Sequence, residues 1–495
     1  MNHIKLIFFV VIGLGLSCAE PSQEVKEPSR PNILFLFADD MAYNAMGAMG
    51  NTLVKTPHLD ELASRGFMFT HAFNQGSWSG AVCVVSRAML NSGRFVYHAR
   101  NDINEVPLWG EVLGQNGYQT FMTGKWHNGD HTVLKSFQQA KSIGKGMFET
   151  LGGPSGTGYK RPTPTNDTWS AADTSLLGHW TPEVKDIVYS DSGKSIGTPY
   201  IAHKHTSTLY ADHAIDFLST WKESEEAEPF FMYVAFNAPH DPRQAPQSYL
   251  DMYPVEEIPL PPNYLPEHPF DQGERYTLRD EILAPFPRSE AAVRRHLQEY
   301  YAIISHMDAE IGRVLAALEA SGALENTYVI FTADHGLAVG SHGLLGKQNA
   351  YDHSIRVPLI FSGPGIPQSK TSDEMVYLQS VHPTTFELAS LSIPSHIEFE
   401  SLYSHFSQDG ATGESEIFGS YKDFQRMLRT ERYKYILYPE VQKTQLFDLI
   451  EDPNELNNLA ENPDSKELIE KMHQSLIRLQ EKVGDPLDIT GVQSK

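Results

Sequence analysis

The sequence predicts an α/β fold in which a doubly wound, largely parallel central sheet is flanked by helices. Two observations predict it. Short apolar runs that look like buried strands alternate with segments of helical periodicity, which is typical of parallel sheets. The chain also has 495 residues, of which 40% are hydrophobic and 11% aromatic, enough for one large core and a smaller unit.

Four runs of β-branched, aromatic and other apolar residues predict strands that are buried on both faces. They are residues 32–37, 118–122, 230–236 and 328–332. Between them the apolar spacing changes to a helical period. The helices expected from this spacing cover residues 59–65, 108–116, 210–221 and about 289–320.

Each predicted strand is followed at once by polar residues. These are Asp39 and Asp40, then Lys125 and His127, then His240, and finally Asp334 and His335. In open α/β sheets, ligands bind outside the carboxyl ends of the strands, so these side chains are expected to converge. A single histidine or aspartate after a strand usually caps a loop, but four such strand ends together indicate a site.

The residue types suggest the chemistry of that site. Three carboxylates, those of Asp39, Asp40 and Asp334, repel one another unless a divalent cation such as Ca²⁺ or Mg²⁺ lies between them. Positive charge is supplied by Lys125, Lys347, Arg87 and Arg94, and protons can be moved by His127 and His240. Such a set suits transfer of an anionic tetrahedral group, sulfuryl or phosphoryl.

The N-terminus has the pattern of an export signal. Lys5 precedes an apolar run that ends near Leu16, and this run is too short to span a bilayer stably. Ser17-Cys18 resembles the lipidation site of bacterial lipoproteins, so Cys18 is expected to carry a lipid that anchors the protein to the membrane. The alternative is an ordinary secretory signal with an incidental cysteine. Either way the sequence predicts an exported protein, and lipidation places it in the cell envelope, periplasmic or at the cell surface.

The net charge argues against one class of partner, and the cysteine content leaves one cysteine unpaired. The formal net charge of -23 argues against a nucleic acid partner, since phosphate binding requires an excess of lysine and arginine. With Cys18 assigned to the anchor, Cys83 has no cysteine partner. It is therefore a candidate reactive group or, alternatively, a small buried hydrophobe.

The order of the motifs resembles that of type I sulfatases, a family with the alkaline-phosphatase-like fold. The match covers nearly the whole mature chain and includes residues 30–40, 56–60, 83–94, 124–127, 238–240, 334–336, 343–347 and 356–360. Residues 432–436 and 446–453 look like the family's C-terminal α+β subdomain, which contains an antiparallel sheet. The expected organisation is a signal peptide (1–17), a lipidated tether (18–29), a catalytic domain (30–400) and a C-terminal subdomain (401–495).

The resemblance implies a role for the cysteine. In this family the matching cysteine is oxidised by a maturation enzyme to formylglycine, whose hydrated aldehyde is the nucleophile. Cys83, Ser86, Arg87 and the Gly93-Arg94 pair stand at the matching positions. Val85 departs from the pattern, because the family has proline or alanine there. The position of Cys83 near the start of a helix is compatible with anion binding.

By the same resemblance, a hydroxyl of hydrated Cys83 attacks sulfur next to one divalent cation, Ca²⁺ in first place and Mg²⁺ as the alternative. The residues implied as ligands are Asp39, Asp40, Cys83, Asp334 and His335. Lys125 and Lys347 would hold the sulfate oxygens, and Arg87 would orient the diol. His240 would protonate the leaving alcohol, and His127 would take a proton from the second hydroxyl to release sulfate.

The expected substrate is a sulfated carbohydrate. Export suits glycan degradation, and residues 130–206 contain aromatic side chains suited to stacking on sugar rings, although such side chains also pack loops down. Two alternatives remain open. One is a phosphoester or phosphonate ester hydrolase of the same superfamily. The other is a non-catalytic glycan-binding relative in which Cys83 stays unconverted.

Overall fold

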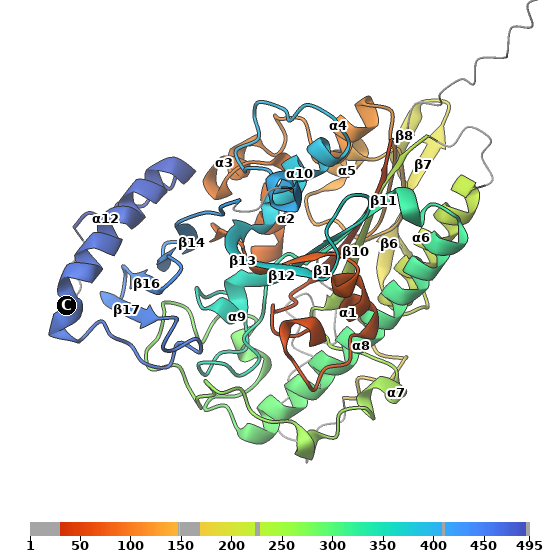
Figure 1. The fold of residues 1–495 in the computed structure, drawn as a ribbon. Helices are drawn as coiled ribbons and strands as arrows, with labels where there is room; N and C mark the ends of the chain where they lie inside the picture. Colours follow the sequence, from red (N-terminus) through yellow and green to blue (C-terminus); the bar gives the residue numbers. More distant parts are fainter. Residues whose placement is uncertain (1–29, 147, 149–168, 223–227, 408–410, 492–495) are drawn as a thin grey trace, which may run out of the picture.

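The computed structural model describes residues 30–146, 148, 169–222, 228–407 and 411–491 (Figure 1). A central sheet of ten strands has the order β13-β2-β12-β11-β1-β10-β4-β5-β6-β9. These strands are β1 (Asn32–Asp39), β2 (Phe67–Phe73), β4 (Gln119–Lys125), β5 (Gln139–Gly144), β6 (Glu183–Lys185), β9 (Tyr200–Ile201), β10 (Phe230–Pro239), β11 (Thr327–Ala333), β12 (Arg356–Ser362) and β13 (Lys370–Tyr377).

The middle of this sheet is parallel. Strands β11, β1, β10, β4 and β5 all run in the same direction. The edges are mixed, because β12 is antiparallel to both β11 and β2, and β6 is antiparallel to β5 and β9. The predicted fold class is confirmed, and its four expected strands are the four neighbours at the centre, β11-β1-β10-β4.

Helices cover both faces of the sheet, as a doubly wound fold requires (Figure 1). On one face, Trp109 of α4 packs against Phe35 and Phe231, with ring centroids 5.0 and 4.9 Å apart. On the other face, Phe217 of α6 lies 4.7 Å from Phe121. The principal helices are α1 (Pro57–Ser64), α2 (Val82–Ser92), α3 (Val96–Asp102), α4 (Trp109–Gln115), α5 (Asp130–Ser136), α6 (Thr206–Lys222), α8 (Glu290–Ala320) and α10 (Val381–Leu388). Short helices occur at α7 (Gln247–Leu250), α9 (Asp352–Ile355) and α11 (Tyr403–Ser407).

The second unit is smaller and contains the expected antiparallel sheet. Strands β14 (Ile417–Tyr421), β15 (Gln425–Arg429), β16 (Tyr433–Tyr438) and β17 (Lys443–Asp448) form a meander beside α12 (Lys466–Val483) (Figure 1). The fifth strand, β3 (Gly76–Ser77), comes from the N-terminal part of the chain and pairs with β14. The segment that leads into α2 therefore belongs to both units. A separate hairpin is formed by β7 (Ile187–Ser190) and β8 (Gly193–Ile196).

A buried ion cluster joins the two units. Lys434 of β16 contacts the carboxylates of Asp352 (2.5 Å) and Glu455 (2.6 Å), and its side chain is inaccessible to solvent. Asp352 belongs to α9, which leads into β12 of the central sheet. Removing one partner from a buried ion cluster typically costs about 3–5 kcal/mol, because the remaining charges stay desolvated. The cluster thus holds the C-terminal sheet against the central one.

The predicted signal peptide (1–17) and the predicted lipidated tether at Cys18 (18–29) lie outside the described residues. Among the helices that the structure describes, none combines the length and the apolar character needed to cross a bilayer. The domain boundaries given above remain predictions.

Candidate active site

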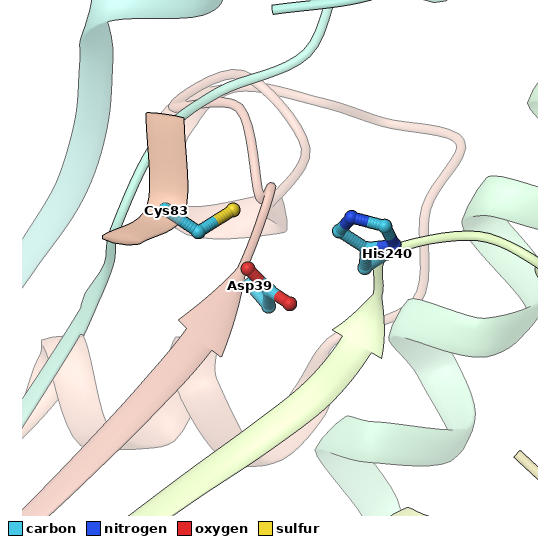
Figure 2. Close-up of side chains that lie close together, drawn as sticks. All are labelled: Asp39, Cys83 and His240. Atoms are coloured by element: carbon cyan, nitrogen blue, oxygen red, sulfur yellow. The ribbon is translucent and has the colours of Figure 1, made fainter. Parts of the chain in front are cut away.

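Four strand ends of the central sheet meet at one place, beside the first turn of α2. Figure 2 shows Asp39 at the end of β1, His240 just beyond β10, and Cys83 in α2, with their side chains directed toward one another. Asp334 follows β11, and Lys125 is the last residue of β4. The convergence predicted from the strand ends is therefore present, and it results from the parallel order β11-β1-β10-β4.

The three carboxylates of this site are almost fully buried. Asp39, Asp40 and Asp334 are 0%, 2% and 0% exposed. The backbone N–H of Asp40 donates to Oδ1 of Asp334 over 3.1 Å, and Tyr300 donates its hydroxyl to the carbonyl of Asp40 over 2.8 Å. Asp40 takes a positive φ of 70°, which turns its carboxylate back toward the site. Backbone geometry thus places three acidic side chains together in a region shielded from water.

The protonation of these acids reflects burial and charge together. Burial and the neighbouring Asp334 raise the pKa of Asp39 to about 8, against the opposing effect of Lys125. Burial also raises the pKa of Asp40 to about 6, although Lys347 lowers it. At Asp334 burial acts in the same direction, but Arg87 and Lys125 outweigh it and hold the pKa of Asp334 well below its usual range. Asp39 and Asp40 therefore bind protons more strongly than isolated carboxylates do, and Asp334 binds them more weakly.

Cys83 is the second residue of α2 and is 2% exposed. Its thiol donates to Oδ1 of Asp40 over 3.5 Å and accepts a hydrogen bond from Nζ of Lys347 over 2.9 Å. Burial, followed by the charges of the three carboxylates, raises the pKa of the Cys83 thiol well above its ordinary value. The unmodified side chain is thus a protonated thiol, a weak nucleophile in this environment.

Three cations face the three acids. Lys347 lies 2.5 Å from Asp40, and Lys125 pairs with Asp39. Arg87, one helical turn after Cys83, donates from Nε to Asp334 over 3.0 Å and from Nη1 to the carbonyl of Lys125 over 2.7 Å. The charges of the site are therefore balanced in pairs, with each lysine bound to one carboxylate.

His240 lies at the end of β10 with its ring in the site. Its Nδ1 is 2.8 Å from the backbone carbonyl of Asp241, so Nδ1 carries the proton, and Nε2 faces Oδ2 of Asp40 at 3.7 Å. Burial, followed by the charges of Lys347 and Lys125, holds the pKa of His240 well below its ordinary value. This ring has a fixed orientation and a free nitrogen toward the reacting position, as a proton carrier requires.

His127 follows β4 with a φ of 69°. Its buried Nδ1 has no hydrogen-bond partner within the described part of the chain. The ring lies so close to Gly146 that a Cβ at that position would be 1.9 Å from Nε2 of His127. Burial, with smaller contributions from Lys125 and Arg87, holds the pKa of His127 well below its ordinary value. The neutral ring can therefore accept a proton.

The geometry of the acids fits a metal ion. Ligand atoms of Asp39, Asp40, Cys83 and Asp334 all lie within 4.8 Å of one another, and Oδ1 of Asp39 is buried without a hydrogen bond. Carboxylate oxygens are the ligands that Ca²⁺ and Mg²⁺ prefer. A second group of this kind joins Asp39, Cys83 and His240. Among the described residues, the three carboxylates supply oxygen donors of the kind that a divalent cation takes.

Two other residues singled out in the sequence lie differently. His335 is buried beside this group but is not one of the four residues whose ligand atoms lie within 4.8 Å of one another. Its Nδ1 is 3.3 Å from the carbonyl of Gly336, and its role as a ligand stays a prediction. Arg94, by contrast, is held by Asp102 (2.9 Å) and Glu398 (3.2 Å) and does not pair with the site carboxylates.

The described aromatic side chains between α5 and α6 differ in their burial. His179 and His205 are buried and stacked at 5.1 Å, and Nε2 of His179 is 3.0 Å from the carbonyl of His240. These two rings therefore support the loop of His240. Tyr189 and Tyr200 are 64% and 41% exposed. The hydroxyl of Tyr189 donates to the carbonyl of Gln138, next to the start of β5, so this ring lies at the end of the sheet opposite to the site.

Sequence reasoning did not select Asp241, Gln348 or residues 279–281, although all of them contact residues of the site or the loops that carry them. Asp241 and Gln348 could have been found because each directly follows a selected residue, His240 or Lys347. The three charged residues Arg279, Asp280 and Glu281 stand between the apolar Leu278 and Ile282 in a region without periodicity. In the sequence they are distinguished only as a run of three charged residues between two apolar ones.

Comparisons with known proteins agree with this site. A family model described as Sulfatase matches residues 31–391, and one described as N-sulphoglucosamine sulphohydrolase, C-terminal, matches residues 340–482. An arylsulfatase of Clostridium perfringens is 28% identical over 463 residues, which is 91% of this chain and 94% of the relative. An ulvan-active sulfatase of Formosa agariphila is 28% identical over 510 residues, or 98% of this chain and 88% of the relative.

A solved structure shares the fold over almost its whole length. It is that of BT4656 in complex with its substrate D-glucosamine-2-N,6-O-disulfate, and it superposes with a TM-score of 0.71 at 22% sequence identity. The superposition covers 92% of this chain and 99% of that one.

Proposed function

The chain belongs to the sulfatase family and is a sulfatase enzyme, and from this premise we propose that it removes sulfate from a sulfated carbohydrate through a formylglycine formed from Cys83. The observation that carries the proposal is the placement of Cys83 within 4.8 Å of three carboxylates, in direct contact with Lys347. The high thiol pKa described above leaves the unmodified cysteine weakly reactive. Conversion to a hydrated aldehyde supplies two hydroxyl groups on one carbon, one to attack sulfur and one to expel sulfate.

The positively charged groups of the site bind different partners: the two lysines bind sulfate, and Arg87 binds Asp334. In the structure Lys125 and Lys347 pair with Asp39 and Asp40. When they turn to the sulfate oxygens, these carboxylates lose their counter-charges. Asp39, Asp40, Asp334 and the residue at position 83 would hold a divalent cation, which would supply the missing positive charge beside the reacting oxygen. Arg87 stays bound to Asp334 and orients the residue at position 83 from one helical turn away.

Protons move through the two histidines. The carbonyl of Asp241 holds Nδ1–H of His240, and Nε2 faces the site. To act as the acid, the ring must first bind a second proton at Nε2, which it then delivers to the leaving oxygen of the sugar. His127 accepts a proton from the second hydroxyl when sulfate leaves. Its buried Nδ1 has no partner among the described residues, so the ring depends on packing against Gly146 for its position.

The proposed substrate class is supported by similar proteins. The ulvan-active sulfatase and the protein solved with D-glucosamine-2-N,6-O-disulfate are named for sulfated carbohydrates.

A release assay tests this function. Protein expressed with a formylglycine-generating enzyme is offered defined sulfated oligosaccharides, and free sulfate is measured against an aryl sulfate and an aryl phosphate. We expect sulfate release from at least one oligosaccharide and faster turnover of the aryl sulfate than of the aryl phosphate. The reverse ratio would favour the phosphoester alternative, and no release from any ester would contradict the proposal.

The role of His240 predicts a loss that depends on the leaving group. In His240→Ala, hydrolysis of a sugar sulfate should fall by about 10²- to 10⁴-fold, the usual contribution of general acid catalysis. Hydrolysis of an activated aryl sulfate should fall far less, because a phenolate leaves without a proton. Steady-state kcat on both substrates measures the difference. Equal losses on the two esters would remove His240 from this role.

We also propose that the protein is exported and held at the cell envelope by a lipid on Cys18. The support is the sequence pattern ending at Ser17-Cys18. Fractionation of the native host should place the wild-type protein with the membranes and Cys18→Ala in the soluble fraction, with kcat unchanged. A wild-type protein found entirely in the soluble fraction would contradict lipidation.

A further inference from the structure

Residues 279–281 approach the active site from an irregular segment between α7 and α8. Glu281 begins a short 3₁₀ helix, Glu281–Leu283, and the segment has no place in the central sheet. Asp280 and Glu281 are only 7% and 3% exposed. Two consecutive carboxylates at such a depth require partners, since unpaired buried charges are costly. Together with the partly buried Arg279, they bond to two loops of the site directly and to a third through Gln348.

The first loop is that of the proposed acid. Arg279 donates from both terminal nitrogens to the carboxylate of Asp241, with Nη1 at 2.7 Å from Oδ1. Asp241 follows His240 directly, and its carbonyl accepts the Nδ1 proton of that ring. A bidentate arginine–carboxylate pair fixes orientation as well as distance. Arg279 thus fixes the residue that sets the direction of the His240 ring.

The second loop carries Lys347. The carboxylate of Glu281 accepts hydrogen bonds from the backbone N–H groups of Leu345 (3.1 Å) and Gly346 (2.8 Å), immediately before Lys347. Arg288 pairs with the same carboxylate at 2.6 Å. A Cβ at Gly346 would lie 2.9 Å from Cβ of Asp280, so this loop approaches the segment too closely for any side chain.

The third loop leads to the nucleophile. Nε2 of Gln348 donates to Asp280 over 2.7 Å and to the carbonyl of Gly80 over 3.2 Å, while its Oε1 accepts the N–H of Lys347 over 3.0 Å. Gly80 stands three residues before Cys83. Asp280 is itself held by Nη1 of Arg279 at 2.8 Å. One short segment is therefore bonded directly to the loops of the acid and the lysine, and through Gln348 to the loop of the nucleophile.

We propose that Arg279, Asp280 and Glu281 form a positioning clamp that fixes His240 and Lys347 relative to position 83. The proposal rests on the proposed function for its effect on catalysis. None of the three residues touches the reacting atoms, so each acts through a neighbour: Arg279 through Asp241, Asp280 through Gln348, and Glu281 through the amides before Lys347. Misplacement of a reacting group by about 1 Å can cost about 10²-fold in rate, so such contacts control turnover.

The two ends of the clamp predict different kinetic signatures. In Arg279→Gln, kcat on a sugar sulfate should fall by about 10-fold or more, while kcat on an activated aryl sulfate stays within about 3-fold, because only proton delivery is impaired. In Glu281→Gln, kcat should fall by a similar factor on both esters, because Lys347 acts on the sulfate itself. Arg279→Lys should recover part of the loss.

Amide exchange supplies a readout that does not depend on activity. In Glu281→Gln, the amides of Leu345 and Gly346 should exchange with solvent at least about 10-fold faster, while the amides of β1 keep their wild-type protection. Glu274→Gln is the matched control, because Glu274 lies in the same segment but pairs with Lys422 and Tyr421. It should leave both kcat values and the exchange of Leu345 and Gly346 unchanged.

The outcomes separate the clamp from the proposed function. A wild-type enzyme that cleaves neither ester contradicts the function, and the exchange measurement then still decides on the clamp. Unchanged exchange of Leu345 and Gly346 in Glu281→Gln overturns the clamp. Equal losses on the two esters in Arg279→Gln overturn the link to His240.

Discussion

Cys83→Ala is expected to abolish turnover of sulfate esters, with kcat reduced by about 10⁴- to 10⁶-fold, as when the nucleophile of a hydrolase is removed. The physical reason is that Cys83 supplies the proposed nucleophile, with its sulfur within 4.8 Å of carboxylate oxygens of Asp39, Asp40 and Asp334. Stopped assays of sulfate release on a sugar sulfate and an aryl sulfate measure the loss. A variant that kept turnover within about 10-fold of the wild-type rate would show that another group attacks sulfur.

The proposed mechanism also predicts the chemical state of the residue at position 83, which mass spectrometry can measure. A thiol that attacked sulfur would leave no second hydroxyl to expel sulfate, so one turnover would trap the enzyme. Active protein is therefore expected to carry formylglycine in the peptide that contains residues 77–87, with activity proportional to the converted fraction. Active enzyme from the native host with only a thiol at position 83 would overturn the mechanism.

The burial of Val85 and Cys83 in the folded protein limits when this conversion can occur. Val85 and Cys83 are 0% and 2% exposed, and Val85 packs in the hydrophobic cluster that also contains residues of the C-terminal sheet. An enzyme that oxidises Cys83 must therefore reach it before α2 packs. If recognition limits conversion, Val85→Ala should raise the converted fraction in a host with a maturation enzyme. The melting temperature of each preparation separates this effect from the loss of core packing.

The sequence predicts the location of those site residues that directly follow regular strands. Strands β11, β1, β10 and β4 are continuous apolar runs, and because they are parallel, the polar residues that follow them had to share one edge. That rule placed Asp39, Lys125, His240 and Asp334 correctly around one point. The contribution of Lys347 followed from the motif order and not from any strand.

The sequence does not predict where residues lie when their position depends on irregular backbone. The segment 279–281 has no periodicity, and its partners Asp241, Leu345 and Gln348 lie 38 to 68 residues away along the chain. The sequence also does not predict that β12 lies between β11 and β2 and runs antiparallel to both. A short apolar run predicts a strand but not the direction of that strand in the sheet. Both features depend on long-range contacts that local pattern does not encode.

Removal of divalent metal is expected to lower kcat by on the order of 10²-fold or more, with recovery on addition of Ca²⁺ or Mg²⁺. Three buried carboxylates share the site, and burial with Asp334 already raises the pKa of Asp39 to about 8 while Lys125 is paired with it. When the lysines bind sulfate, the carboxylates need another positive charge. Treatment with a chelator followed by metal titration, with sulfate release as the readout, measures the effect.

Asp39→Asn separates metal binding from folding. The substitution removes the carboxylate that pairs with the buried Lys125, so the metal-free variant should unfold at a lower temperature than the metal-free wild type. The rise in melting temperature that Ca²⁺ gives the wild-type protein should be largely lost, since a ligand stabilises only the state that binds it. Asp212→Asn, which removes a carboxylate paired with Lys204 and Arg313, should keep the full response. Full activity in a metal-stripped wild-type sample, or an undiminished Ca²⁺ response in Asp39→Asn, would show that these carboxylates serve another purpose.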